Sequence, residues 1–188
     1  MLYVCVMTNI LVANTKGGCG KSTLVASLAD VLDADITDHD HQGTIRIASR
    51  FTNRHKPKKH GDSSLKKIII HDTPPYNSGN LRSLLKECEL IVMPTKLQYP
   101  DFLAMRALAD EIVKLKLEGK TFIVYNEVRK PLNKTYVELK GLYEKNYPNL
   151  KKAKTELSQL VAFSRVLVEP LTGNALMQIK SLAEEFKI

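Results

Sequence analysis

The residues with the clearest chemical potential lie in one glycine-rich segment, 14–23. An apolar run, 10–13, precedes this segment, and apolar residues at helical spacing follow it. The order of strand, tight turn and helix is the context of a phosphate-binding loop, because glycines let several backbone N–H groups converge on one anion. A helix that starts near Lys21 adds the positive end of its dipole.

The side chains of this segment have distinct predicted tasks. Lys21 can reach the β- and γ-phosphates of a nucleotide, the Ser22 hydroxyl can bind Mg²⁺, and Thr23 is the expected hydroxyl near the α-phosphate. A glycine turn with incidental lysines is the alternative, and the position of Gly-Lys-Ser at a strand-to-helix junction disfavours it. The predicted nucleotide-binding residues of the loop are Lys16, Gly17, Gly18, Cys19, Gly20, Lys21, Ser22 and Thr23.

Acidic residues follow two predicted strands. Asp38 and Asp40 come after a short run, 34–37, and their spacing points both side chains toward one site at the carboxyl end of a strand. Asp72 ends a buried apolar run, 67–72, where an acid would hold Mg²⁺ through water. A polar turn is the alternative for the first pair, and an ordinary strand end is the alternative for Asp72.

Strands and helices alternate along the chain, which predicts an α/β fold with a doubly wound, mostly parallel sheet and helices on both faces. A nucleotide then belongs at the carboxyl ends of the strands, where the motifs fall. Asp101 is the expected N-cap of one helix. The predicted strands are 10–13, 34–37, 67–72, 90–94, 121–126 and, weakly, 153–157; the predicted helices are 21–32, 80–87, 102–117, 133–146, 160–168 and 174–186.

Length and composition indicate one globular domain, 1–188, with 44% hydrophobic and 26% charged residues. Met7 is an alternative start, which would make residues 1–6 an N-terminal extension. The early apolar residues lack a basic region before them, so a buried strand is favoured over a signal peptide. Cys5, Cys19 and Cys88 form no C-x-x-C pair, which fits a reduced cytosol without a disulfide framework or cysteine metal site.

Positive charge is concentrated in two segments. The net charge is +8, while segment 46–67 has eight Lys and Arg against one acid, and segment 129–154 has eight against two. The residues outside them are therefore acidic on balance, and the basic segments favour a partner such as nucleic acid or an anionic membrane. A solvated surface loop is the alternative for segment 46–67.

The loop resembles the deviant Walker A motif of the ParA/MinD superfamily of ATPases. Thr15 stands where the strict G-x-x-x-x-G-K-[ST] pattern has its first glycine, and Lys16 begins Lys-Gly-Gly-Cys-Gly-Lys-Ser-Thr. In that superfamily the early lysine reaches across a dimer interface to the partner's nucleotide. The resemblance implies this role for Lys16, and with it a catalytic set of Lys16, Lys21 and Asp40.

Two further segments resemble motifs of the same superfamily. Asp38-His-Asp-His-Gln-Gly is similar to D-x-D-P-Q-G, with His41 in place of proline, and it implies that Asp40 positions the attacking water while Asp38 lies near the metal. Asp72-Thr-Pro-Pro resembles the Walker B motif, so the implied metal site is Ser22, Asp38 and Asp72. Asn126 resembles the position that reads the adenine edge, with an Asn turn as the alternative.

The chain most resembles the short plasmid-partition ATPases of the ParA type that lack an N-terminal DNA-binding domain. This resemblance implies ATP and Mg²⁺ as cofactors, an ATP-dependent homodimer, non-specific DNA binding by the dimer, and slow hydrolysis stimulated by a ParB-like centromere-binding adaptor. A cytoplasmic, nucleoid-associated location is expected. Because the superfamily places DNA contacts late in the chain, the candidates are Lys151, Lys152, Lys154 and Arg165, with Lys56, Lys58 and Lys59 as the second choice.

Other functions on this fold stay open. A MinD-type membrane-surface ATPase needs a basic amphipathic tail, and adjacent acids, Glu184 and Glu185, argue against one here. Iron–sulfur scaffold relatives need paired cysteines, which the chain lacks. A metabolic amidoligase or kinase remains an alternative. The altered segment 38–43 also leaves open a regulatory module that binds ATP and hardly hydrolyses it.

Overall fold

The computed structural model describes residues 7–40, 43–58, 62, 64, 66–75, 79–129 and 134–188. Its strands form one sheet in the order β2-β3-β1-β4-β5-β6, and every described pairing is parallel. The predicted doubly wound α/β sheet is confirmed, with a parallel direction throughout the described strands. These are β1 (Thr8–Val12), β2 (Asp35–Asp38), β3 (Ile68–Asp72), β4 (Leu90–Lys96), β5 (Thr121–Asn126) and β6 (Lys151–Lys152).

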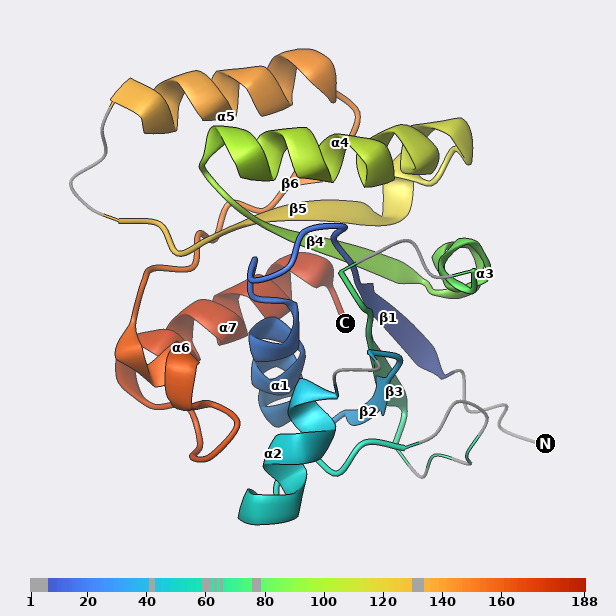
Figure 1. Cartoon of the computed structure of the whole chain (residues 1–188), viewed down its shortest axis with the longest axis vertical. Helices are drawn as coiled ribbons and strands as arrows, with labels where there is room; N and C mark the ends of the chain where they lie inside the picture. Colours follow the sequence, from blue (N-terminus) through green and yellow to red (C-terminus); the bar gives the residue numbers. More distant parts are fainter. Residues whose placement is uncertain are drawn as a thin grey trace.

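Helices cover both faces of the sheet (Figure 1). One face packs against α1, α2, α6 and α7, and the other against α3, α4 and α5. Short crossovers of this kind are the expected connections between parallel strands. The described helices are α1 (Lys21–Leu32), α2 (Thr44–Thr52), α3 (Leu81–Glu87), α4 (Tyr99–Lys114), α5 (Lys134–Asn146), α6 (Val161–Arg165) and α7 (Gly173–Phe186), with a 3-10 turn, η1 (Glu118–Lys120).

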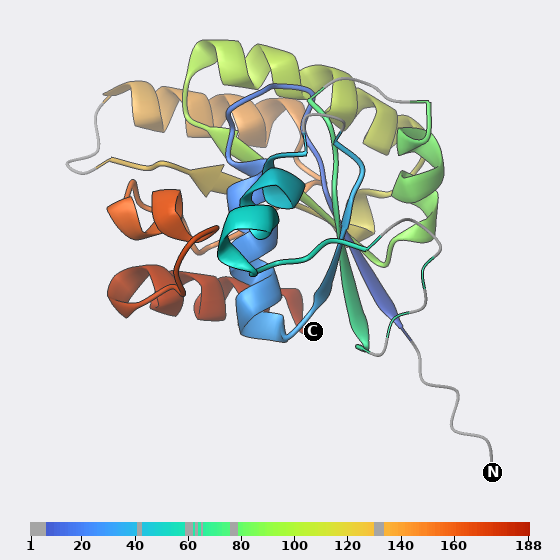
Figure 2. The same ribbon diagram turned by 60° about the horizontal axis from the view of Figure 1, so that its bottom comes forward.

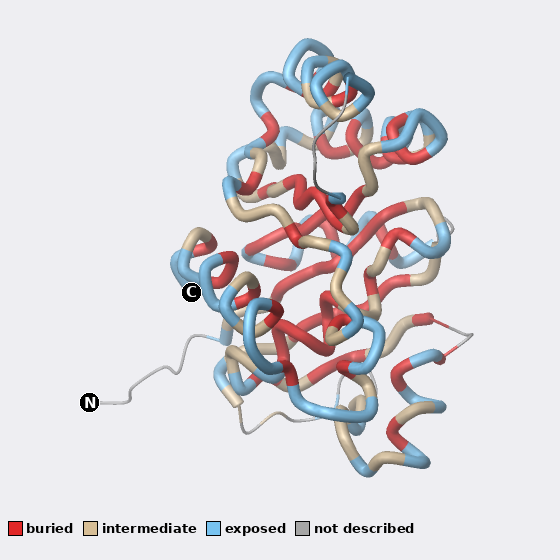
Figure 3. The backbone as a smooth tube through the Cα atoms, turned by 90° about the vertical axis from the view of Figure 1, so that its left-hand side faces the viewer, coloured by how far each residue is buried: buried red, intermediate tan, exposed pale blue. Residues whose placement is uncertain are grey.

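The central strand β1 shows how the sequence builds two cores. Ile10 and Val12 belong to the cluster on the α1 face, whereas Leu11 and Ala13 belong to the cluster on the α4 face. Successive residues of a strand point to opposite faces, so a continuous apolar run is what a strand covered on both sides requires. Figure 3 shows the result, with buried backbone in the middle and exposed backbone on the outer turns of the helices.

Two helices differ from the sequence-based expectation. The basic segment 46–67 begins with part of α2, which was not predicted, and Figure 2 shows this helix lying in front of α1. Asp101 is not an N-cap, because α4 starts earlier, with Gln98 as its cap and Pro100 in the first turn, where proline is tolerated. Asp101 is instead a buried residue of that first turn.

The predictions for the edge of the sheet were also partly wrong. The ladder with β5 is formed by Lys151–Lys152, while the predicted strand 153–157 only runs beside β5 in irregular form. Its regular pairing stops because the N–H groups of Lys154 and Thr155 donate to the Glu185 carboxylate of α7. The predicted helix 160–168 is confined to α6, and the chain then turns.

Some sequence-based predictions fall outside the described residues. They concern the extension 1–6, His41 of the acidic motif, Lys59 of the basic loop and the first residue of the predicted helix 133–146. For that helix, the described part runs from Lys134 to Asn146, as expected.

Candidate functional site

The phosphate loop joins β1 to α1 and depends on glycine at two positions. Gly18 and Gly20 have φ values of 71° and 95°, in the region that side chains with a Cβ rarely adopt. Gly20 is also required for steric reasons, because a Cβ at this position would lie 2.1 Å from the Asn126 Nδ2 atom. The loop therefore approaches the end of β5 closely, and only glycine fits there.

The Lys21 ammonium is held inside the loop. Lys21 is 7% exposed, and its Nζ donates to the Lys16 carbonyl at 2.9 Å, as does the Cys19 thiol at 3.4 Å. Asn14 fixes the start of the loop, because its Oδ1 accepts the Lys16 N–H at 3.0 Å and its Nδ2 donates to the Pro94 carbonyl at 2.8 Å. Asn14 was not singled out from the sequence, since its contacts reach a strand 80 residues away.

Two adjoining cavities lie at this end of the sheet. One of about 230 Å³ surrounds the phosphate loop, and one of about 210 Å³ lies between the loop, the end of β5 and α6. They share Gly20 and Thr23, so one elongated ligand with a phosphate end and a base end could occupy both. The first is lined by Gly17, Gly18, Gly20, Lys21, Ser22, Thr23, Asp40, Thr44 and Pro75.

The three predicted acids come together beside the loop. Asp38 and Asp72 are register partners in β2 and β3, so their side chains leave the same face of the sheet. The Asp40 N–H donates to Asp38 Oδ1 at 2.9 Å, and Asp40 itself is buried and lines the phosphate cavity. Asp72 receives a hydrogen bond from the Ser22 side chain. The predicted metal residues and the predicted water-positioning residue are thus neighbours.

Burial disfavours the charged form of two of these acids, Asp72 and Asp38. It raises the pKa of Asp72 to about 7, with the nearby Asp38 charge adding to the effect and the Ser22 hydrogen bond opposing it. Burial also raises the pKa of Asp38, against the opposing hydrogen bond from the Asp40 amide. Asp72 Oδ1 and Asp38 Oδ2 are buried without a hydrogen-bond partner, although the Arg46 guanidinium lies 3.7 Å from Asp38 Oδ2. Unsatisfied carboxylate oxygens of this kind fit a hard cation such as Mg²⁺.

A magnesium ion at this place would depend on its nucleotide for further ligands. Among the described residues, no group of three or more histidine, cysteine or acidic side chains is arranged to hold a metal ion. The Ser22 hydroxyl, Asp72 and Asp38 are the protein oxygens on hand, and Mg²⁺ at phosphate sites ordinarily takes one or two carboxylates plus phosphate oxygens and waters. The residues present therefore fit the predicted cofactor.

The charge state of Asp72 gives a stability prediction. The folded chain keeps a proton on Asp72 up to about pH 7, whereas an unfolded aspartate releases it near pH 4, so stability falls as pH rises through this window. Asp72→Asn removes this penalty. We expect it to raise the Tm by roughly 5 °C at pH 8 and to change it little at pH 4, as measured by thermal unfolding without nucleotide. An equal effect at both pH values would contradict the buried protonated acid.

Lys16 does not line the cavity of its own loop. Its ammonium forms an ion pair with Asp101 of α4, whose side chain is 1% exposed, while that of Lys16 is 31% exposed. The second oxygen, Asp101 Oδ1, has no hydrogen-bond partner. Sequence reasoning missed this contact because it joins residues 85 positions apart. The only local indication of this contact was the position of Asp101 at the start of the helix that follows β4.

Asn126, the last residue of β5, lines the second cavity beside Gly20. Its Nδ2 donates to the Cys19 carbonyl at 2.9 Å, and its Oδ1 accepts the N–H of Glu127. The side chain therefore supports the phosphate loop in this state. It also lines the second cavity together with Phe163, where a base would lie.

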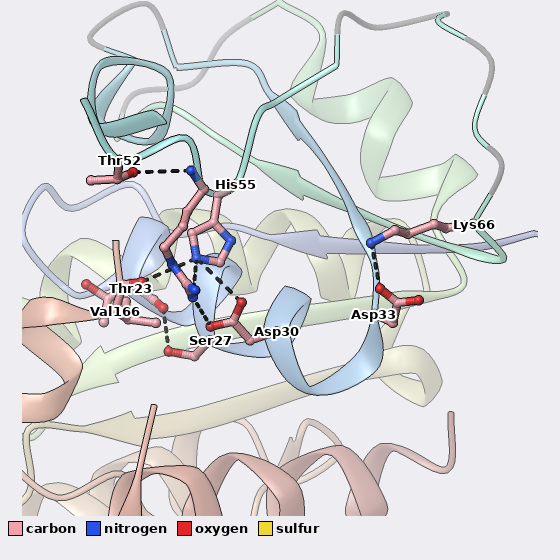
Figure 4. A network of polar contacts seen from close by, with 9 residues as sticks. Thr23, Ser27, Asp30, Asp33, Thr52, His55, Lys66 and Val166 are labelled. Atoms are coloured by element: carbon pink, nitrogen blue, oxygen red, sulfur yellow. Dashed lines mark hydrogen bonds and ion pairs between the residues drawn. The ribbon is translucent and has the colours of Figure 1, made fainter. Parts of the chain in front are cut away.

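Much of the first basic segment is neutralised by neighbouring acids. Arg54 and His55 contact Asp30 of α1, and the His55 ring also contacts the Val166 carbonyl (Figure 4). Lys66 pairs with Asp33 at 2.7 Å and Lys58 with Asp35 at 2.6 Å. Several positive side chains of segment 46–67 therefore form ion pairs that hold this segment against α1 and β2. Of the second-choice DNA residues, Lys56 is exposed and without a described acidic partner.

The first-choice DNA residues do not form one cluster. The Lys152 side chain is 10% exposed and pairs with Glu144, whereas the ammonium groups of Lys151 and Lys154 have no described acidic partner. Lys151 is paired with Phe122 at the start of β5, its Nζ 5.0 Å from that ring. Arg165 lies in α6, near the phosphate loop at the opposite end of the strands, and pairs with Glu169.

In the described part of the chain, none of the helices combines the length and the apolar character needed to cross a membrane.

No protein-family model matches the sequence. No curated protein matches it either. Solved structures do resemble it. A Borrelia burgdorferi B31 protein described as a plasmid partition protein, bound to AMPPNP, has a TM-score of 0.74 and 17% identity, over 97% of this chain and all of the other.

Two further structures extend this comparison. Cyanothece McdA in complex with ATP has a TM-score of 0.74 and 12% identity, with 97% of each chain covered. The MinD cell division protein of Aquifex aeolicus has a TM-score of 0.68 and 12% identity, over 96% of this chain and 97% of the other. The chain therefore has the fold of plasmid-partition, McdA and MinD proteins, and the resemblance indicated by its motifs is confirmed at the level of the fold.

Proposed function

We propose that this protein is a ParA-type ATPase that converts ATP and water into ADP and phosphate and uses the cycle to partition DNA. The observation that carries the proposal is the arrangement of two lysines in one loop. Lys21 points into the loop, while Lys16 points away from it to Asp101. An ATPase that acts as a monomer needs only Lys21 at its phosphates. Lys16 is therefore available to contact a nucleotide bound to another copy of the chain.

The chemistry of hydrolysis rests on positioning and electrostatics. When ATP binds, the Lys21 ammonium exchanges its hydrogen bond to the Lys16 carbonyl for contacts with the β- and γ-phosphates. The positive charge that these phosphates require is therefore already present in the loop. Asp40 lines the same cavity and is the residue that orients the attacking water. Ser22, Asp72 and Asp38 hold Mg²⁺, which when bound with ATP offsets the charge of the phosphates. Asn126 and the cavity beside α6 receive the adenine.

Dimerisation is the proposed step that completes the site. When ATP is bound, Lys16 leaves Asp101 and reaches the γ-phosphate of a second copy, where it stabilises the charge that develops during transfer. A monomer is then a slow enzyme, and a ParB-like adaptor accelerates hydrolysis by favouring this arrangement. The fold shared with a protein described as a plasmid partition protein supports this assignment.

The proposed role of Asp40 differs from that of the ATP-binding residues, because its substitution should affect hydrolysis and not ATP binding. Asp40→Ala should bind ATP and dimerise, yet hydrolyse at least about 100-fold more slowly, because the water loses its orienting group. Phosphate release and nucleotide affinity measured on the same sample test this. If Asp38→Ala shows that behaviour and Asp40→Ala does not, the roles of the two acids are exchanged.

DNA binding is the test that distinguishes partition from other ATP-dependent functions. With a net charge of +8, a dimer should bind DNA without sequence preference, more tightly with ATP because two surfaces act together, and with a steep loss of affinity as salt rises. Lys151→Glu with Lys154→Glu should weaken binding at least tenfold and spare ATPase activity measured without DNA. Co-sedimentation with DNA at several salt concentrations, with and without ATP, measures both effects.

The control for this pair is another exposed lysine pair on the opposite face of the sheet, Lys86→Glu with Lys114→Glu, which changes the net charge equally. If the control pair weakens DNA binding as much, the effect is one of total charge and the assigned surface is wrong. If binding is insensitive to salt or to nucleotide, DNA partition loses its mechanism, and a metabolic ATP-dependent enzyme becomes the better assignment. The same proposal places the protein in the cytoplasm, associated with the nucleoid.

A further inference from the structure

Helix α2 has an apolar stripe that no described residue covers. Thr44, its first residue, lines the phosphate cavity, and Ile47 and Phe51 follow at spacings of three and four residues, on the same side of the helix. Ile47 is 52% exposed and Phe51 is 85% exposed. A largely exposed phenylalanine one helical turn from an exposed isoleucine forms a contiguous apolar surface, of the kind found at contact sites. The stripe starts at the phosphate cavity itself.

A second apolar stripe lies at the start of α4. Tyr99 is 50% exposed and Leu103 is 61% exposed, one helical turn apart. Between them in sequence, Asp101 points inward and holds Lys16. The Tyr99 hydroxyl donates to the Glu138 carboxylate of α5 at 3.4 Å, and this carboxylate also lies 3.6 Å from the Lys134 ammonium. The α2 stripe is flanked by Arg50 and by Arg46, whose guanidinium lies 3.7 Å from the Asp38 carboxylate.

The two stripes lie on opposite sides of the phosphate loop. The buried apolar residue of α2, Ile45, belongs to the core on one face of the sheet, while Phe102 and Met105 of α4 belong to the core on the other. In Figure 1, α4 lies above and α2 below the loop that leads from β1 into α1. A two-fold axis at the mouth of the cavity would exchange these two sides, so the α2 stripe of one copy would face the α4 stripe of the other.

From this placement we propose that a second copy of this chain covers both stripes, with α2 of each protomer packed on α4 of its partner. The inference rests on the proposed dimer, in which Lys16 must reach the other copy's nucleotide. It is supported by two features: each stripe borders either the phosphate cavity or Lys16, and both stripes are apolar. Because Thr44 lines the cavity, this contact also joins the dimer surface to the nucleotide.

The first experiment measures dimerisation with AMPPNP by analytical ultracentrifugation. Phe51→Ser and Leu103→Ser should each raise the dimer Kd at least tenfold and leave the affinity of the monomer for AMPPNP unchanged. The matched control is Met177→Ser on α7, which removes another large side chain that is 66% exposed. Dimerisation of both stripe variants at the wild-type Kd would overturn the inference. A wild-type chain that stays monomeric with AMPPNP would overturn the proposed dimer as well.

The second experiment tests which stripes meet. Phe51→Cys and Leu103→Cys variants are prepared separately, each with Cys5→Ser, because the remaining cysteines, Cys19 and Cys88, are buried. A short bismaleimide should link the mixed variants with AMPPNP present, and much less without it. Neither variant alone should form a cross-linked dimer. Efficient linkage of Phe51→Cys to itself would show that α2 faces α2, and would exclude the proposed pairing.

Discussion

We expect Lys21→Ala to lower the affinity for ATP by roughly 100-fold or more. The ammonium is buried in the loop and bonded only to a backbone carbonyl, so it can turn to the phosphates without breaking an ion pair. A charge-assisted hydrogen bond contributes about 1.5–3 kcal/mol, and the Lys21 ammonium would donate to both the β- and the γ-phosphate. Equilibrium binding of a fluorescent ATP analogue, with unlabelled ATP as competitor, measures the loss.

Two controls separate loss of the ligand contact from loss of the fold. Lys86→Ala removes an exposed lysine of α3 and should bind ATP as the wild type does. The Tm of Lys21→Ala without ATP should stay close to that of the wild type, while stabilisation by saturating ATP should disappear, since only a ligand that binds the folded state raises the Tm. Unchanged ATP affinity in Lys21→Ala would show that this loop is not the nucleotide site.

The loop and its supporting strands were predictable because their signals are local. Glycines, Lys21 and Ser22 lie within a few positions of one another. The short run before Asp38 and the apolar run before Asp72 identify two strand ends that a parallel sheet must bring to the same edge. The register of β2 and β3 then makes the two acids neighbours without any further information. Local patterns of this kind determine the fold class and most of the site.

Contacts between distant segments were not predictable in the same way. The sequence around Asp101 is equally compatible with a helix cap and with a buried acid, and only the packing of α4 against the loop selects the second. The basic segment 46–67 suggested a free positive surface, yet Asp30, Asp33 and Asp35 lie beside it in space and take up much of its charge. Net charge counted along a chain cannot reveal such pairing.

A large effect on both dimerisation and turnover is expected at Lys16. Lys16→Ala should bind ATP as a monomer and lose ATP-dependent dimerisation, with hydrolysis reduced at least about 100-fold, because the partner's site loses a charge in trans. The same change leaves the Asp101 carboxylate buried and without its cation. Removing one partner of a buried pair is costly, and since Lys16 is partly exposed we expect a loss of about 1–3 kcal/mol in folding stability.

A second substitution separates these two consequences. Asp101→Asn in the Lys16→Ala background removes the unpaired charge, so the Tm should recover while dimerisation and hydrolysis stay absent. Asp101→Asn alone should keep Lys16 available and therefore dimerise with AMPPNP at least as well as the wild type. Sedimentation with AMPPNP, phosphate release and thermal unfolding measured on all four proteins form a complete cycle. If turnover returns with the Tm in the double variant, Lys16 serves only the fold, and hydrolysis does not depend on a lysine from the partner.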